Sequence, residues 1–107
     1  MTPLATIATR VEDCLVAAWV DIRTGAVLEQ QPPHTDELIA PAIEAAIEMM
    51  RTRERPPRMV LLSARHVHIV QRTVLDPNRV LVVICARSAN LGLAVSMVRR
   101  EMETEVA

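Results

Sequence analysis

Val80-Leu-Val-Val-Ile-Cys-Ala86, followed by Arg87-Ser-Ala-Asn-Leu-Gly-Leu93, is the stretch of this 107-residue chain that decides the fold. Seven consecutive apolar residues, many of them β-branched, are too few to span a membrane and predict a strand buried on both faces. Helical spacing begins within four residues and runs to about Glu105. Ser88 and Asn90 are both candidate N-caps for that helix. Gly92 costs about 1 kcal/mol relative to Ala in a helix, which predicts close approach to another surface.

The composition excludes several classes of protein. Trp19 is the only aromatic residue, so the core is aliphatic, and the net charge of −1 gives no general attraction to nucleic acid or anionic membranes. All basic residues are Arg, which removes Schiff-base lysines and the phosphate-binding lysine of P-loop enzymes. No signal peptide and no membrane-spanning segment are predicted. We therefore expect a cytoplasmic protein in which Cys14 and Cys85 are buried, reduced thiols.

The remaining elements follow from periodicity and turn residues. We predict a short helix within 2–13, a strand at Cys14–Asp21 and a second strand at Ala26–Glu29 that closes a hairpin at Gly25. A helix then begins either at Thr35, with an irregular first turn, or at Pro41. Strands at 58–63 and 66–74, a type I turn at Asp76-Pro77-Asn78 and the strand at 80–86 precede the last helix. This order predicts a single α+β domain, 1–107, with a mostly antiparallel five-stranded sheet.

The helix within 38–51 has an apolar arc of about 200°, wider than the stripe of a little over 100° that packing on one sheet requires. Two explanations are open for its second side. Either the N-terminal segment or a loop of the same chain covers it, or the helix meets its own copy in a two-fold dimer. We favour the dimer. The predicted interface residues are Ile39, Ala42, Ile43, Ala46, Met49 and Met50.

Three pieces of this chain resemble the roadblock/LC7 family. They are the hairpin Val16–Asp21 closing at Gly25, the long apolar helix after it, and Val80–Ala86 leading into Ser88-Ala-Asn-Leu-Gly-Leu93. The similarity covers about residues 10–105, with a shortened first helix as the main departure. It implies a sheet of order 2-1-5-4-3 with helices on both faces. It also implies pairing of the central helices and joining of the third strands in a dimer.

The same resemblance implies a bacterial roadblock-like module without catalytic residues. We expect it to bind and regulate a small Ras-like GTPase, with activation of the GTPase as one form of regulation. Its partners would be itself as a homodimer, or a paralogous roadblock protein, together with the GTPase. Two alternatives are an adaptor in a larger assembly without a GTPase, and a ligand-sensing domain of PAS-like or profilin-like design. The implied strand order also places Cys14 nearly opposite Cys85.

Catalytic and metal-binding chemistry receive little support. His66 and His68 project from one face of a strand, but no further ligands are spaced to complete a zinc site. Ser63 lies close to His66 in sequence, yet no nucleophile elbow surrounds it. We expect no metal, no cofactor and no enzymatic activity.

Arg51, Arg53, Arg55 and Arg58 cluster where the central helix ends. They are explained either by interaction with the helix C-terminus and solvent, or by an electropositive rim that meets an acidic partner. Nucleic acid is a weaker alternative, because aromatic stacking platforms are missing. An anion at the free amides after Ser88 is conceivable, but simple capping explains those amides better.

Overall fold

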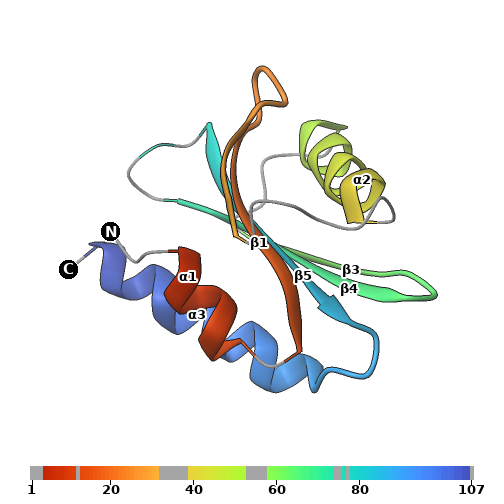
Figure 1. Ribbon diagram of the computed structural model, residues 1–107. Coiled ribbons are helices and arrows are strands. Elements are labelled where there is room, and N and C mark those ends of the chain that lie inside the picture. Colours follow the sequence, from red (N-terminus) through yellow and green to blue (C-terminus); the bar gives the residue numbers. More distant parts are fainter. Residues whose placement is uncertain are drawn as a thin grey trace.

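The computed structural model describes residues 4–11, 13–31, 39–52, 58–73, 76 and 78–106. Within these residues, three helices and five strands follow one another in the predicted order (Figure 1). Their bounds are α1 Leu4–Arg10, β1 Cys14–Asp21, β2 Val27–Gln31, α2 Ile39–Thr52, β3 Arg58–Leu62, β4 His66–Arg72, β5 Arg79–Ala86 and α3 Leu91–Val106.

The five strands form one sheet of order β2-β1-β5-β4-β3, and each neighbouring pair is antiparallel. This confirms the predicted fold class and strand order. β1 and β5 lie at the centre, where Ala17 faces Val83 and Trp19 faces Leu81. Every residue from Val16 to Val20 and from Val80 to Cys85 is buried. Continuous apolar sequence therefore marks strands covered on both faces, as predicted.

Two apolar layers cover the sheet. On one face, α1 and α3 pack over Trp19, Ile69, Leu81 and Val83, and on the other face α2 packs over a separate set of side chains. Figure 1 shows α1 and α3 side by side below the sheet and α2 above it. Arg10 of α1 joins the buried carboxylate of Glu101 on α3 at 2.9 Å, which ties these two helices together.

Several boundaries differ from the predicted ones. α1 is shorter than 2–13, and Asp13 has a left-handed backbone (φ 53°), which turns the chain into β1. β2 extends to Gln31, because Gln31 pairs with Ala17. β3 stops before Ser63, which lies in the turn, and β4 stops before Thr73. α2 already begins at Ile39, and Pro41 lies in its first turn, where its missing N–H would have had no intrahelical acceptor. Thr35 lies outside the described residues.

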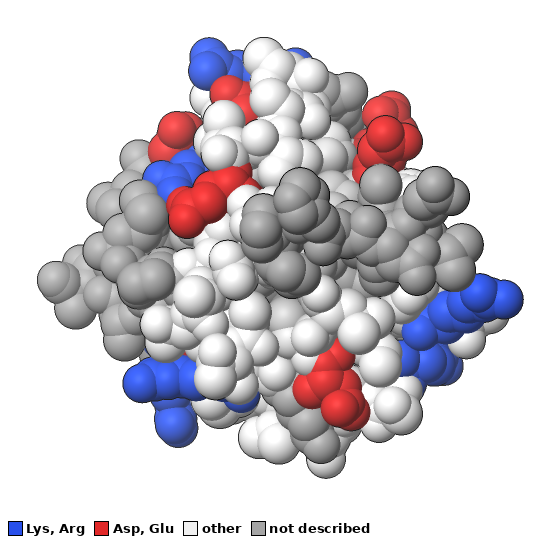
Figure 2. Space-filling model, viewed as in Figure 1, with Lys and Arg blue, Asp and Glu red and all other residues white. Residues whose placement is uncertain are grey.

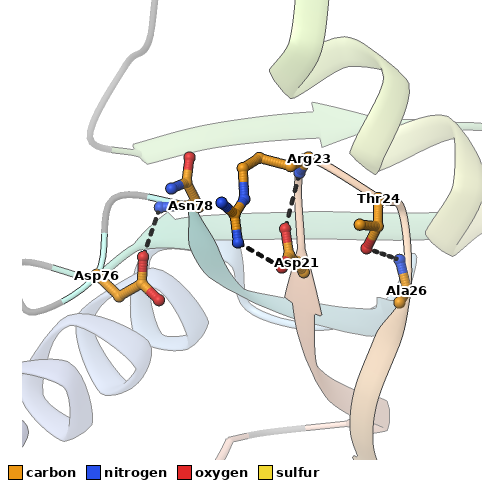
Figure 3. Close-up of polar contacts among 6 residues, drawn as sticks. All are labelled: Asp21, Arg23, Thr24, Ala26, Asp76 and Asn78. Carbon is orange, nitrogen blue, oxygen red and sulfur yellow. Dashed lines mark hydrogen bonds and ion pairs between the residues drawn. The ribbon is translucent and has the colours of Figure 1, made fainter.

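Two turns at the same end of the sheet are held by side-chain hydrogen bonds (Figure 3). After β1, the Asp21 carboxylate accepts from the backbone N–H of Arg23 at 2.9 Å, and the Thr24 hydroxyl accepts from that of Ala26 at 3.2 Å. Before β5, Asp76 accepts from the backbone N–H of Asn78 at 3.0 Å and its carbonyl accepts from Arg79. This confirms a turn opened by Asp76, although Pro77 lies outside the described residues.

Helix α3 begins as the sequence suggested, and the structure decides between the two candidate N-caps. The Asn90 carboxamide oxygen accepts from the backbone N–H of Leu93 at 3.0 Å, so Asn90 rather than Ser88 is the N-cap. Gly92 was expected to mark a close approach to another surface, and no described part of this chain makes one. It is exposed, and among the described residues a Cβ placed on it would meet the Asn90 side chain, at an ordinary 3.7 Å.

Gly92→Ala should therefore stabilise the protein. The new methyl group has room, and alanine loses less backbone entropy on entering a helix, so the free energy of unfolding should rise by about 0.5–1 kcal/mol. Urea unfolding followed by circular dichroism measures this. A matched control is Ala94→Gly in the same helix, which should destabilise. A loss of stability in Gly92→Ala would mean that a second surface does approach the glycine.

Candidate interaction surface

The inner side of α2 packs on the sheet of its own chain. Ile43, Ala46, Ile47 and Met50 are buried, and they follow the i, i+3, i+4, i+7 spacing of one helical face. They pack on the upper layer of the sheet, whose members are Val16, Ala18, Val20, Val70, Val80, Val82 and Ile84. A normal stripe of four residues is therefore enough to hold α2 in place.

The outer side of α2 carries the apolar surplus that the sequence indicated. Pro41 and Ala45 are exposed and Met49 is half-buried, and these three residues lie four apart along the helix. We call them the outer strip of α2. Glu44 and Glu48, both exposed, run along one side of the strip. The outer strip is therefore one residue wide, with the small side chain of Ala45 at its centre and two glutamates along one side.

The six residues predicted for a dimer interface do not lie on one surface in the structure. Ile43, Ala46 and Met50 contact the sheet of their own chain, and Met49 alone among the described side chains belongs to the outer strip. Ile39 and Ala42 lie in the helix, but their side chains are outside the described set. Helical periodicity shows how wide the apolar surface of α2 is, but it does not show which part of that surface packs on the sheet. Pairing of α2 with its copy stays a prediction, and its candidate residues become Pro41, Ala45 and Met49.

Strand β3 forms one edge of the sheet and is apolar on both faces. Met59 and Leu61 are half-buried on the α2 side, whereas Val60 and Leu62 are 36% and 53% exposed on the other side. Four apolar residues in succession are the pattern of a strand with neighbours, and exposed apolar edges invite pairing with another chain. The roadblock/LC7 resemblance implied that this strand joins its copy in a dimer, but the residues that would show it were not singled out. The signal was the run Met59-Val-Leu-Leu62.

The predicted arginine cluster is only partly described. Arg58 opens β3, and its Nε donates to the Gln71 side-chain oxygen at 2.6 Å, so it joins β3 to β4. Arg51 lies in the last turn of α2, while Arg53 and Arg55 lie outside the described residues. Figure 2 shows charged groups of both signs scattered over the face that it presents, without a broad basic area among the residues drawn in colour. An arginine rim that contacts a partner stays a prediction.

His66 and His68 project from the α2 side of β4, with ring centroids 6.2 Å apart. His68 is buried, and neither of its ring nitrogens has a partner among the described residues. Within that part of the chain, no group of three or more His, Cys, Asp or Glu residues could hold a metal ion. Burial lowers the pKa of His68 below its ordinary value, and the charge of His66 lowers it further.

Ser63 has a structural role beside these histidines. Its hydroxyl accepts from the backbone N–H of His66 at 3.0 Å and donates to the His66 carbonyl at 3.2 Å. The serine thus closes the turn between β3 and β4 through the backbone rather than through the imidazole.

None of the helices in the described ranges has the length and apolar content that a bilayer crossing requires.

No protein-family model matches this sequence, and no curated protein matches it. Solved structures do share its fold. The chain aligns with MglC from Myxococcus xanthus over 94% of its own length and 91% of that protein, with a TM-score of 0.68 at 16% identity. A roadblock/LC7 domain from Streptomyces avermitilis aligns over 94% and 89%, with a TM-score of 0.68 at 13% identity.

The gliding protein MglB from Thermus thermophilus is a further structural neighbour. It aligns over 94% of this chain and 80% of its own, with a TM-score of 0.66 at 19% identity. The chain therefore has the roadblock/LC7 fold that the sequence resemblance implied.

The burial of His68 predicts a pH dependence of stability. Because its folded-state pKa lies below the ordinary value, the unfolded chain binds a proton first as the pH falls. The His68 contribution to stability is thus complete above about pH 6.5 and declines as the pH falls below it. Urea unfolding of the wild type and of His68→Leu at about pH 7.5 and about pH 5.5 tests this. The wild type should lose more stability than the variant.

The matched control is His66→Leu, which leaves the buried imidazole in place and should retain most of the acid-induced loss. Equal losses in the wild type and in His68→Leu would show that His68 is not the group responsible.

Proposed function

We propose that this chain is a dimeric protein-interaction module of the cytoplasm that binds and regulates a small Ras-like GTPase. The observation that carries the proposal is its fold, which it shares over nearly its whole length with MglB, MglC and a roadblock/LC7 domain. The roadblock/LC7 resemblance implies a platform for such GTPases. Regulation would act through surface complementarity, with the module ordering the catalytic elements of the GTPase itself.

Self-association is supported by two surfaces near one another. β3 presents an apolar edge, and α2 lies on the face that includes Met59 and Leu61 of the same strand. A two-fold axis beside β3 would pair the two β3 strands and bring the two α2 outer strips together. One MglB structure is described as having a tetrameric arrangement, which is self-association in a protein of this fold.

The outer strip suits close contact between helices. Ala45 has a small side chain that allows two helix backbones to approach, and Met49 supplies adaptable apolar surface. Glu44 and Glu48 border the strip on one side, so they lie at the rim of such a contact rather than within it. A charge introduced at the centre of the strip would be desolvated without a partner.

Ala45→Glu should therefore convert the dimer to a monomer. Ala45 is exposed in a single chain, so the fold itself should tolerate the change, whereas a buried unpaired carboxylate at the interface should weaken dimerisation by about 2 kcal/mol or more. Sedimentation equilibrium measures the dimer dissociation constant. Ala5→Glu, at an exposed alanine of α1, is the matched control and should remain dimeric. Circular dichroism verifies that both variants are folded. A wild type that is monomeric at micromolar concentration would contradict the dimer directly.

The GTPase is tested by capture from the organism of origin with the purified, immobilised chain. The lysate is supplied either with GDP or with a GTP analogue that is not hydrolysed, and a Ras-like GTPase should be retained preferentially in one nucleotide state. Its rate of GTP hydrolysis or of nucleotide exchange should change when the chain is added.

The arginine rim is tested on the recovered GTPase. Replacing Arg51, Arg53 and Arg55 together by Ala should weaken binding by about tenfold if they face an acidic partner surface. The control removes the same charge at three other arginines, Arg23, Arg65 and Arg100, which are exposed elsewhere on the chain. Recovery of no GTPase in either nucleotide state would instead favour an adaptor without a GTPase.

A further inference from the structure

Cys14 and Cys85 lie directly opposite each other on the two central strands, where the register pairs Cys14 of β1 with Cys85 of β5. This confirms the expectation that followed from the strand order. Both cysteines are free thiols in this structure. No other cysteine occurs in the sequence, so any disulfide within one chain joins these two residues.

An irregularity in β1 turns Cys14 to the face where Cys85 lies. Val16, Ala18 and Val20 point toward α2, and strict alternation would send Cys14 to that side as well. The register shifts between Cys14 and Val16, which leaves Leu15 as the extra residue of a β-bulge. Beyond this bulge Cys14 packs with Cys85 in the layer under α1 and α3. The two thiols are therefore on the same face of the sheet.

The hydrogen bonds around the pair define its geometry. The N–H of Ala86 donates to the carbonyl of Asp13 at 3.0 Å, and the N–H of Cys14 donates outside the ladder to the carbonyl of Val11. Cys14 and Cys85 therefore form a non-hydrogen-bonded antiparallel pair, in which Cα atoms are about 4.5 Å apart and side chains are close. That separation lies within the range of about 4.4–6.8 Å that a disulfide requires.

The two thiols are unequal in accessibility and in acidity. Cys14 is half-buried, whereas Cys85 is fully buried. The hydrogen bond from the Cys85 thiol, with a further one from the backbone of Val16, lowers the pKa of Cys14 despite its partial burial. The same hydrogen bond, together with burial, raises the pKa of Cys85. A reagent from solvent thus meets Cys14 first, and it meets the more reactive of the two sulfurs.

We propose that Cys14 and Cys85 form a redox site, in which Cys14 is attacking thiol and Cys85 resolving thiol for a cross-strand disulfide. The oxidant is a small-molecule disulfide. The Cys14 thiolate attacks one of its sulfurs, forms a mixed disulfide and releases one thiolate. Cys85 then gives its proton to that thiolate and attacks the Cys14 sulfur, and the second thiolate leaves and takes up from solvent the proton that Cys14 released on ionising. The protein loses two electrons, and the small disulfide is reduced to two thiols.

Once a mixed disulfide has formed, Cys14 no longer carries the hydrogen-bonded sulfur and negative charge that raise the pKa of Cys85, so Cys85 ionises more readily than in the reduced protein. The resulting bond would join the beginning of β1 to the end of β5. Cys14 follows the turn that leaves α1 and Cys85 precedes the turn that leads into α3, so oxidation would fix the two strand ends at which these helices join the sheet.

The test treats the folded wild-type chain with oxidised glutathione and follows its intact mass. The expected product has lost two hydrogens, carries no glutathione and yields one peptide pair that links Cys14 to Cys85. Dithiothreitol should restore the original mass. The oxidised chain should melt at a temperature higher by on the order of 10 °C, because the bond closes a long loop of the unfolded chain.

Two variants separate the roles of the cysteines. Cys85→Ala should stop at the mixed disulfide and gain one glutathionyl group on Cys14, whereas Cys14→Ala should stay unmodified while it is folded. A wild type that retains glutathione without closing, or that forms only disulfides between chains, would overturn the proposal. So would a Cys14→Ala chain that reacts at the wild-type rate. If Cys85→Ala fails to fold, the mass and the linked peptide pair of the oxidised wild type still test the proposal.

Discussion

The antiparallel pairing of β1 with β5 is the interaction on which the rest of the structure depends. These strands occupy the middle of the sheet, and they supply most of the sheet's side chains in both apolar layers, among them Trp19 and Leu81 on one face and Val20 and Val80 on the other. Each face then needs its own cover, which α2 provides on one side and α1 with α3 on the other. Because the centre is closed on both faces, it is the edges and the outer surfaces of the helices that are left to meet partners.

The two edges of the sheet are not equivalent. β2 begins with the exposed Val27 and Leu28 but continues with Glu29, Gln30 and Gln31, so most of its edge carries polar side chains of the kind that discourages pairing. β3 is almost entirely apolar after Arg58, and its exposed Val60 and Leu62 are more typical of a strand that has neighbours on both sides. α2 adds a narrow outer strip on the same side of the sheet as Met59 and Leu61. These features are the basis for proposing that a second copy docks at β3 and α2.

Much of the fold was predictable because it rests on local patterns. The uninterrupted apolar runs at 80–86 and 14–20 identified the central strands, and Asn90 was among the two N-caps proposed for α3. Strand order and the opposition of Cys14 to Cys85 required the resemblance to roadblock/LC7 proteins, because a pattern within one strand does not say which strand lies beside it. The structure confirmed both.

The candidate surface was harder to predict, since it depends on how elements are oriented in space. Helical periodicity showed that α2 has more apolar surface than a sheet needs, but Ile43, Ala46 and Met50 were assigned to a partner when the sheet itself covers them. Gly92 was attributed to a close approach that the described neighbours do not make. The β-bulge at Leu15, which turns Cys14 toward Cys85, leaves no mark in a sequence of apolar residues.

In the proposed dimer, β3 is the edge at which the second copy docks. Hydrogen exchange of backbone amides, measured by mass spectrometry at high and at low protein concentration, tests it most directly. Amides of Arg58–Leu62 should become protected as the concentration rises, while those of Val27–Gln31 should exchange at a constant rate. Exchange in β3 that does not depend on concentration, or concentration-dependent protection of β2 instead, would contradict it.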